Sequence, residues 1–147
     1  MENKPKRRYL PLLLATGIPV LGLIFIFVFV DLEPDAVDAS GQARYELHCA
    51  NCHGKAGEGL RGLYPPLAKS DYLAQNQGNL ACQIRHGLQG PIMVNGHPYN
   101  MAMPGNPNVS PKEITAIINY VNTSWGNDIP TVTQASVEKR LKYCAGG

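Results

Sequence analysis

The sequence predicts an all-α fold, in which several short helices form one domain after a single N-terminal transmembrane helix. Three observations support this fold class. Residues 9–30 form an apolar stretch without a charged side chain. An amphipathic helix with strong capping signals begins near Ser110. No alternation of strand and helix patterns runs along the 147 residues, a length that holds one domain and little more.

The N-terminal stretch is expected to be a membrane anchor. A basic tail, residues 1–8, precedes residues 9–30, and as a helix these 22 residues would be about 33 Å long, enough to cross a bilayer core. A cleaved secretory signal is the alternative, because it too combines a basic start with an apolar stretch. A signal's apolar region is usually shorter, however, and no Ala-x-Ala cleavage pattern follows Val30. We therefore expect a retained single span.

Charge indicates which way the chain faces. The basic tail should stay on the cytoplasmic side, so the rest of the chain should face outward. Residues 31–39 are acidic, contain Pro34 and are expected to be a linker. From Asp31 onward the chain has nine basic and ten acidic residues. The domain is therefore nearly neutral and lacks the clustered cations of a nucleic-acid-binding protein.

Local signals predict three helices in the domain: one before the middle of the chain, one in its middle and one near its end. Ser40 can cap a helix that runs through Tyr45. A second helical patch covers residues 80–86. The clearest helix begins at Ser110, where a capping box with Glu113 coincides with proline at the first helical position. Its apolar stripe has the spacing i, i+3, i+4 and i+7: Ile114, Ile117, Ile118 and Val121.

The C-terminal part is expected to add one more helix over residues 131–143. Its inward-facing residues would be Val132, Val137 and Leu141. Cys82 and Cys144 stand apart from the other cysteines, and in an oxidising compartment we expect them to form a disulfide that ties this tail to the middle of the domain. The alternative is two separate thiols.

The most constraining motif is Cys49-Ala50-Asn51-Cys52-His53, because Cys-x-x-Cys-His is the attachment signature of c-type haem. A two-residue gap brings both thiols within reach of the vinyl groups along one haem edge. Cys49 and Cys52 would form two thioether bonds, and His53 would ligate the iron. A thioredoxin-like dithiol should sit in a βαβ setting, and a zinc site needs a second ligand pair; neither pattern is seen in the sequence.

With this motif on its first helix and a capped helix near its end, the chain resembles class I cytochrome c over residues 40–127. The matching residues in the family's order are Gly41-Gln42, Gly54, Pro65-Pro66-Leu67, Tyr99-Asn100, Met103-Pro104 and the helix Ser110–Trp125. The likeness is greatest to membrane-bound cytochromes c and fused cytochrome c domains of respiratory oxidases. The residues that indicate this subgroup are Asn119-Tyr120-Val121 and Ser124-Trp125-Gly126-Asn127. The resemblance implies several short helices around one covalent haem c, followed by a C-terminal extension, residues 128–147.

The resemblance also implies the remaining iron ligand. In the family a methionine, commonly followed by proline, is the second axial ligand, and Met103 fits this pattern. A thioether binds iron weakly but stabilises the ferrous state. Met101 is the main competitor. The other candidates, for which packing or surface roles are expected, are Met93, His48, His86 and His97.

A backbone carbonyl is expected to orient the axial histidine. In the family a proline carbonyl accepts a hydrogen bond from the unligated ring nitrogen, which fixes the tautomer and tunes the iron. The Pro-x-Leu spacing favours Pro65 over Pro66 for this role in holding His53. The alternative is that both prolines only shape a turn.

The implied function is one-electron transfer by a membrane-anchored monohaem cytochrome c. It would carry electrons in a respiratory chain from a quinol-oxidising complex to a terminal haem-copper oxidase, or belong to such a complex. Because both axial positions are filled, no site remains for a small-molecule substrate, and we do not expect an enzyme. The expected location is the bacterial inner membrane, in a single pass with the haem domain on the periplasmic side, because the family's haem is attached there.

Other functions remain open from the sequence. The same domain occurs in cytochrome c subunits of dehydrogenases and of nitrite or nitric oxide reductases. A gas sensor or peroxidase would have a labile or missing methionine ligand. A membrane-tethered thiol–disulfide oxidoreductase would carry no haem and would cycle Cys49 with Cys52.

Overall fold

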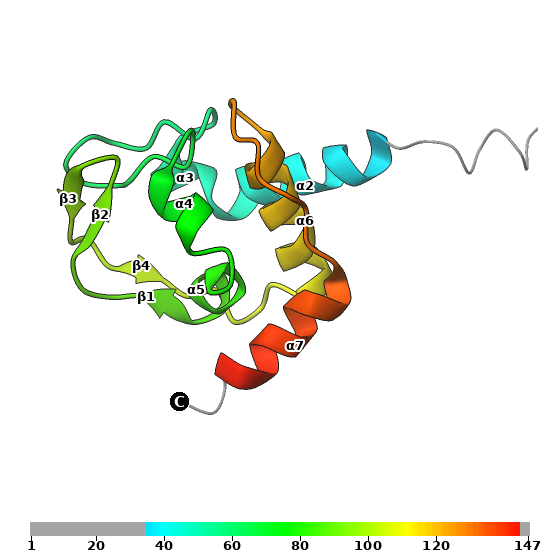
Figure 1. The fold of residues 1–147 in the computed structure, drawn as a ribbon. Helices are drawn as coiled ribbons and strands as arrows, with labels where there is room; N and C mark the ends of the chain where they lie inside the picture. The colour runs from blue at the N-terminus through cyan, green and yellow to red at the C-terminus, as the bar shows by residue number, and fades with distance from the viewer. Residues whose placement is uncertain (1–34, 145–147) are drawn as a thin grey trace, which may run out of the picture. The chain divides into compact units, whose positions relative to one another are not determined.

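The structure, a computed structural model, describes residues 35–144, in which short helices are joined by long loops and two small strand pairs (Figure 1). The helices are α2 (Asp35–His48), α3 (Ala50–His53), α4 (Asp71–Gln75), α5 (Leu80–His86), α6 (Pro111–Thr123) and α7 (Gln134–Cys144). The strands are β1 (Gly87–Leu88), β2 (Ile92–Val94), β3 (His97–Tyr99) and β4 (Met103–Pro104). Strand β1 pairs with β4, and β2 pairs with β3, both in antiparallel register.

The predicted fold class, an all-α domain after one transmembrane helix, needs two corrections. First, the domain contains strands, whose two or three residues are too few to show a period-two pattern. Second, no helix within residues 35–144 is long and apolar enough to cross a membrane. The longest, α2, has 14 residues and is about 21 Å long, against a bilayer core of about 30 Å.

The predicted localisation is corrected for the same reason. A single pass through the bacterial inner membrane needs a spanning helix, and the described part of the chain has none. The stretch on which that prediction depended, residues 9–30, lies outside the described residues, as do the basic tail 1–8 and the first residues of the expected linker.

Helix α2 begins earlier than predicted. It starts at Asp35, so residues 35–39 of the expected linker are helical and Ser40 lies inside the helix rather than capping it. No proline or glycine follows Pro34 until Gly41, and nothing therefore stops the helix before Ser40. The prediction placed the start at the capping residue nearest to the motif.

The crossing of α2 and α6 forms the centre of the domain (Figure 1). Gly41 lies at the closest approach, because a Cβ at this position would be 2.6 Å from the carbonyl oxygen of Ala116 and 2.9 Å from Cβ of Tyr120. Only glycine lets the two backbones come this close. At the edge of the crossing, Arg44 forms an ion pair of 3.1 Å with Glu113.

Helix α6 confirms the clearest sequence signal. Ser110 is its N-cap, the reciprocal bonds of a capping box with Glu113 are present, and Pro111 is its first residue. The apolar stripe is buried as predicted: Ile114, Ile117, Ile118 and Val121. These side chains pack with Tyr45 of α2 and Leu73 of α4 into one core.

The C-terminal extension docks on α5 and α6 through helix α7 (Figure 1). Val137 is buried, and Val132 and Leu141 pack at the edge of the core, as predicted. The fully buried Asn122 of α6 donates to the carbonyl of Pro130 at 3.0 Å and to Oε1 of Gln77 at 2.8 Å. These bonds satisfy polar groups that would otherwise be costly to bury.

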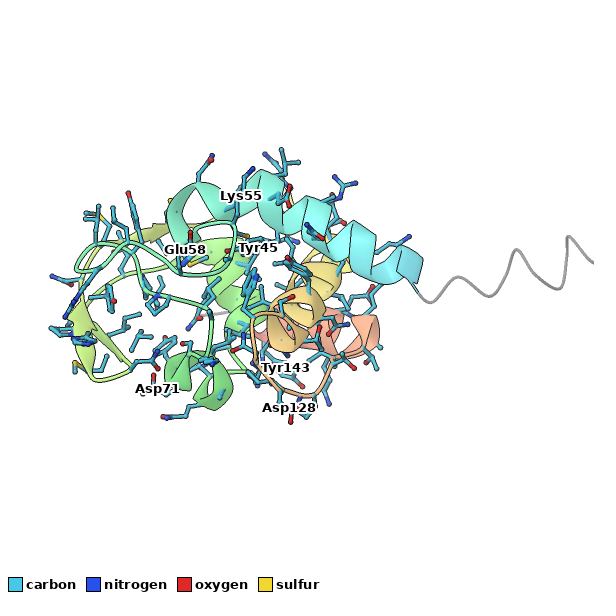
Figure 2. All side chains as sticks on the ribbon, turned by 90° about the horizontal axis from the view of Figure 1, so that it is seen from above. Tyr45, Lys55, Glu58, Asp71, Asp128 and Tyr143 are labelled. Carbon is cyan, nitrogen blue, oxygen red and sulfur yellow. A yellow bond between two sulfur atoms is a disulfide. The ribbon has the colours of Figure 1, made fainter. Side chains whose placement is uncertain are left out.

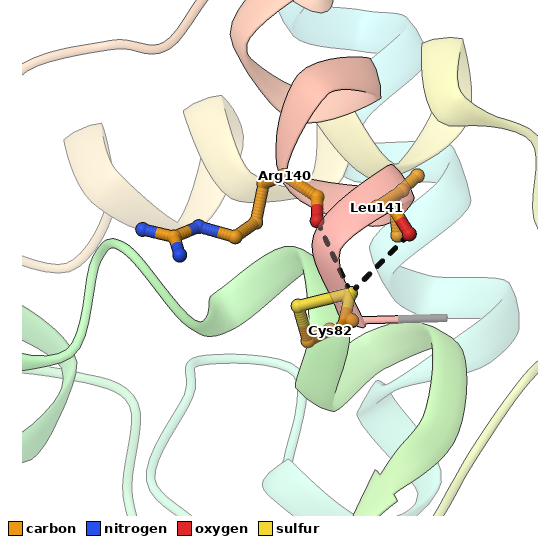
Figure 3. The surroundings of a disulfide bond; sticks show 4 residues. Cys82, Arg140 and Leu141 are labelled. Atoms are coloured by element: carbon orange, nitrogen blue, oxygen red, sulfur yellow. Dashed lines mark hydrogen bonds between the residues drawn. A yellow bond between two sulfur atoms is a disulfide. The ribbon is translucent and has the colours of Figure 1, made fainter. Parts of the chain in front are cut away.

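The predicted disulfide is present and joins α5 to α7. Cys82 and Cys144 are bonded across a sequence separation of 62 residues, with Cα atoms 5.9 Å apart (Figure 3). The bond lies beside the backbone of Arg140 and Leu141 in the last turns of α7 (Figure 3). The end of the chain is thus covalently fixed to the helix that precedes β1.

Candidate haem-binding site

The Cys-x-x-Cys-His motif lies where α2 gives way to α3. The amide of Cys49 still donates to the carbonyl of Tyr45, as in a continuing helix, and the amides of Cys52 and His53 donate to the carbonyl of Cys49 at 3.1 and 3.0 Å. This tight turn holds both thiols and the imidazole on one short segment. Cys49 and Cys52 are half-buried and are not bonded to each other.

The motif faces an apolar cavity that is partly open to solvent. All four predicted site residues line this cavity: Cys49, Cys52, His53 and Met103. Most of its remaining wall is apolar and comes from α4, α5, α6 and the strands. A cavity with a largely apolar wall and a few polar groups suits a large planar apolar cofactor.

His53 is oriented by the predicted carbonyl. Its Nδ1 lies 2.9 Å from the backbone oxygen of Pro65, which confirms Pro65 over Pro66. Because the carbonyl can only accept, Nδ1 carries the proton in this bond and Nε2 keeps its lone pair. Burial lowers the pKa of His53 below its usual value, and the bond to Pro65 opposes this only in part. The imidazole is therefore neutral near pH 7, as iron ligation requires.

Met103 is the more sheltered of the two methionines at the cavity. It is partly buried in β4, where it pairs with Leu88 of β1, whereas Met101 precedes the strand and is 50% exposed. The exposed His86 and His97 do not line the cavity. Met93 does not line it either, and its 57% exposure shows that the expected packing role was wrong.

His48 is a further histidine at the cavity. It is exposed at the end of α2, and its Nδ1 lies 3.2 Å from Nδ2 of Asn106. This contact connects the motif's end of the cavity with the loop after β4. No pattern in the chain predicts it, because the two residues are 58 positions apart.

Tyr45 joins the motif to the core. Its hydroxyl donates to the carbonyl of Gly54, directly after the motif, at 2.6 Å, and its ring stacks in a tilted geometry against Tyr120 and Trp125. Burial and, secondarily, the nearby Cys49 and Glu58 raise the pKa of Tyr45 well above its usual value. Tyr45 lies beside Glu58 (Figure 2). The phenol therefore remains a hydrogen-bond donor at any pH the protein meets.

Sequence reasoning missed the polar groups in the cavity wall. Gln83 of α5 donates to the hydroxyl of Tyr72 at 2.9 Å, and Tyr64 also lines the space. No motif marks these residues, because they come from separate loops and helices.

A second feature that was missed did have a signal in the sequence. Asn95-Gly96, both with positive φ, forms the turn between β2 and β3.

Cys49 does not have the character of a reactive redox thiol. Burial, followed by the nearby Cys52, raises the pKa of Cys49 to about 11. Reactive dithiols instead have a lowered pKa, which supplies the thiolate nucleophile. Among the side chains that the structure describes, residues 41–144, no cluster of three or more His, Cys, Asp or Glu could hold a metal ion, so a zinc site has no ligand set there.

The donor set and the cavity fit haem c. Two unpaired thiols, a neutral imidazole held through Nδ1 and a thioether sulfur border one apolar space. The short helices around this space and the motif at the end of α2 define the class of protein as one that carries covalently bound haem.

Comparison with known proteins identifies the family. The family model described as Cytochrome c matches residues 39–125, and the chain belongs to the cytochrome c family. A cytochrome c-552 from Thermus thermophilus is 34% identical over 106 residues, which cover 69% of this chain and 72% of the relative. The protein is a cytochrome c electron carrier with covalently bound haem c.

Larger proteins contain a similar domain. The cytochrome c subunit of a quinone-dependent alcohol dehydrogenase from Gluconacetobacter polyoxogenes is 38% identical over 102 residues. The corresponding subunit from Gluconobacter oxydans is 31% identical over 105 residues. These matches cover 67% and 70% of this chain but 22% of each subunit.

Proposed function

We propose that the protein is a monohaem cytochrome c that carries single electrons in a respiratory chain, between a quinol-oxidising complex and a terminal haem-copper oxidase. The observation that carries the proposal is the cavity bordered by Cys49, Cys52, His53 and Met103. The covalent haem supplies the redox chemistry when it is bound. The chain's own residues hold it, shield it from water and set its potential.

Each site residue has one role in this proposal. Cys49 and Cys52 form the thioether bonds, and the short turn between α2 and α3 keeps their spacing fixed. His53 binds iron through Nε2, since Nδ1 is engaged by Pro65. Met103 would supply the second iron ligand, and its weak thioether bond would favour the ferrous state. The apolar wall raises the potential further, because it disfavours the additional positive charge of the oxidised centre.

The test of the site is optical. Haem that resists acid-acetone extraction and gives the pyridine haemochrome spectrum of a thioether-linked group would establish covalent attachment. Its ratio to protein should be one. The oxidised protein should show a weak far-red band that disappears in Met103→Leu and persists in the matched variant Met101→Leu. A band that depends on Met101, or protein without haem from cells that mature other cytochromes c, would contradict the proposal.

A second candidate is supported by the alcohol dehydrogenase relatives, whose cytochrome subunits contain a similar domain. In this case the protein would accept electrons from a dehydrogenase rather than from a quinol-oxidising complex. Stopped-flow mixing of the oxidised protein with each reduced donor distinguishes the two. Reduction by the quinol-oxidising complex and oxidation by the terminal oxidase at turnover rates support the main proposal. Fast reduction by the dehydrogenase alone supports the alternative.

A further inference from the structure

The segment that carries Met103 has little structure of its own. Strand β4 has two residues, and the chain from Gly105 to Ser110 is loop. A methionine binds iron weakly, so its position must be fixed by the protein before it can compete with water or another ligand. Groups outside the segment must therefore hold it in place.

The C-terminal end of α5 makes several contacts to this segment. The carbonyl of Ile84 accepts from the amide of Asn106 at 2.9 Å, and β1, which follows α5 directly, pairs Leu88 with Met103. The two backbones are in contact here. A Cβ on Gly105 would lie 2.5 Å from the carbonyl carbon of His86.

Arg85 adds two hydrogen bonds that reach beyond the strand. Its Nη1 donates to the carbonyl of Pro107 at 2.9 Å, and its Nη2 donates to the carbonyl of Val109 at 2.6 Å. Its Nε is buried without a hydrogen-bond partner, so these two bonds set the orientation of the guanidinium. No carboxylate of residues 41–144 forms an ion pair with it. The planar fork of arginine directs two separate nitrogens at the two carbonyls, whereas lysine offers all its donors from one nitrogen.

We propose that Arg85 is a positioning residue for Met103: its guanidinium clamps the carbonyls of Pro107 and Val109 and so holds the methionine segment at the cavity. This inference rests on the proposed function, in which Met103 is the axial ligand. Helix α5, which carries Arg85, is itself fixed to α7 by the disulfide between Cys82 and Cys144. Val109, at the other end of the segment, is buried in the core.

The test measures how easily the methionine is displaced. Imidazole is titrated into the full-length, haem-loaded ferric protein while the far-red band is followed. Arg85→Gln should bind imidazole about tenfold more tightly, because the loss of a charge-assisted hydrogen bond destabilises the segment by roughly the free energy of a tenfold change. Arg85→Lys should fall between this variant and the native protein. The exposed Arg61→Gln is the matched control and should bind imidazole like the native protein.

A second readout separates positioning from general stability. As the pH is raised, the far-red band should be lost about one pH unit earlier in Arg85→Gln than in the native protein. This shift corresponds to the same free energy as the tenfold change in imidazole affinity. The double variant Cys82→Ser/Cys144→Ser should move both readouts in the same direction by less. A lower thermal midpoint with unchanged imidazole affinity would assign Arg85 a structural role only and overturn the inference. If Arg85→Gln does not accumulate as a haem protein, the same two readouts are measured on Arg85→Lys. A native imidazole affinity in Arg85→Lys would then overturn the inference.

Failure of the ligand assignment would look different. If Met103→Leu keeps the far-red band and the native imidazole affinity, Met103 is not the ligand and the proposed function is wrong on this point. If Met103→Leu loses the band while Arg85→Gln keeps both the band and the native affinity, only the inference on Arg85 fails.

Discussion

The two sides of the cavity are built in opposite ways. The histidine side, which consists of α2, α3 and α6, carries the motif on a helix whose packing against α6 is the centre of the core. The methionine side, which consists of α5, β1, β4 and the loop to Val109, carries Met103 on a two-residue strand. Apolar packing at the close crossing of α2 and α6 holds the histidine side in place. Backbone hydrogen bonds, the side chain of Arg85 and the distant disulfide hold the methionine side.

The difference matches the chemistry of the two ligands. In the proposed ligation, covalent attachment and a strong imidazole bond would allow the histidine side to be rigid and continuous with the core. The proposed methionine bond would be weak, so this ligand would depend on how well the loop is held. Substitutions at the helix crossing of the histidine side should therefore affect folding of the whole domain. Substitutions in or against the loop that carries Met103 should first affect the iron ligand, whereas the disulfide, which closes a long loop, should affect global stability.

The largest effect is expected from removal of the disulfide. The bond closes a long loop, and in the chain-entropy description its loss in Cys82→Ser/Cys144→Ser should lower the free energy of unfolding by about 4 kcal/mol. Guanidinium denaturation of the haem-loaded protein, followed by circular dichroism, measures this change. Lys139→Ala, on the exposed face of α7, is the control and should change little. A loss equal to that of the control would show that the disulfide adds no stability to the domain.

The crossing on the histidine side should be nearly as sensitive. In Gly41→Val the side chain would collide with the backbone of Ala116, and the overpacked crossing should lose about 3 kcal/mol. The same denaturation experiment applies. Ala43→Val lies on the exposed face of the same helix and tests the helix propensity of valine alone. Equal losses in the two variants would mean that the close approach at Gly41 is not a determinant of stability.

The histidine side is also the part that could be predicted from the sequence. Its motif is local, its capping box lies within four residues, and the stripe of α6 repeats with the helical period. The bond from His53 to Pro65 followed from the family's order of motifs. Local and periodic signals can be read from a chain in the order in which they occur.

The methionine side could be predicted only in outline. Helix α5 and the disulfide were expected, but the clamp by Arg85 joins residues 22 and 24 positions apart, and no pattern marks an arginine that binds carbonyls. Strands of two residues have no readable period. The turn at Asn95-Gly96 could have been recognised from its type I′ sequence.

A smaller change on the histidine side should affect the motif directly. Tyr45→Phe removes the hydroxyl that donates to the carbonyl of Gly54 and leaves this partly buried oxygen without a partner. We expect a loss of about 1 kcal/mol of stability. Tyr143→Phe, at a tyrosine that is 68% exposed, is the matched control. If both variants unfold like the native protein, the hydrogen bond after the motif is replaced by water without cost.

The smallest expected effect is a pH dependence at the start of α6. Hydrogen bonds from the backbone and hydroxyl of Ser110, with a further contribution from Arg44, lower the pKa of Glu113 below its ordinary value of 4.5. Because the folded-state pKa is the lower one, this stabilisation is fully present above pH 4.5 and is lost as the pH falls through the folded-state value. Glu113→Gln keeps the shape of the capping box but does not titrate.

The thermal midpoint of the native protein should therefore fall more steeply in acid than that of Glu113→Gln, measured from about pH 3 to 6 where carboxylates titrate. The exposed Glu46→Gln should instead follow the native curve. Added salt should reduce the contribution of Arg44 but not the hydrogen bonds from Ser110, since screening acts on exposed charges. Identical acid profiles for the native protein and Glu113→Gln would show that this cap contributes through its shape alone, and that the histidine side owes its stability to packing rather than to charge.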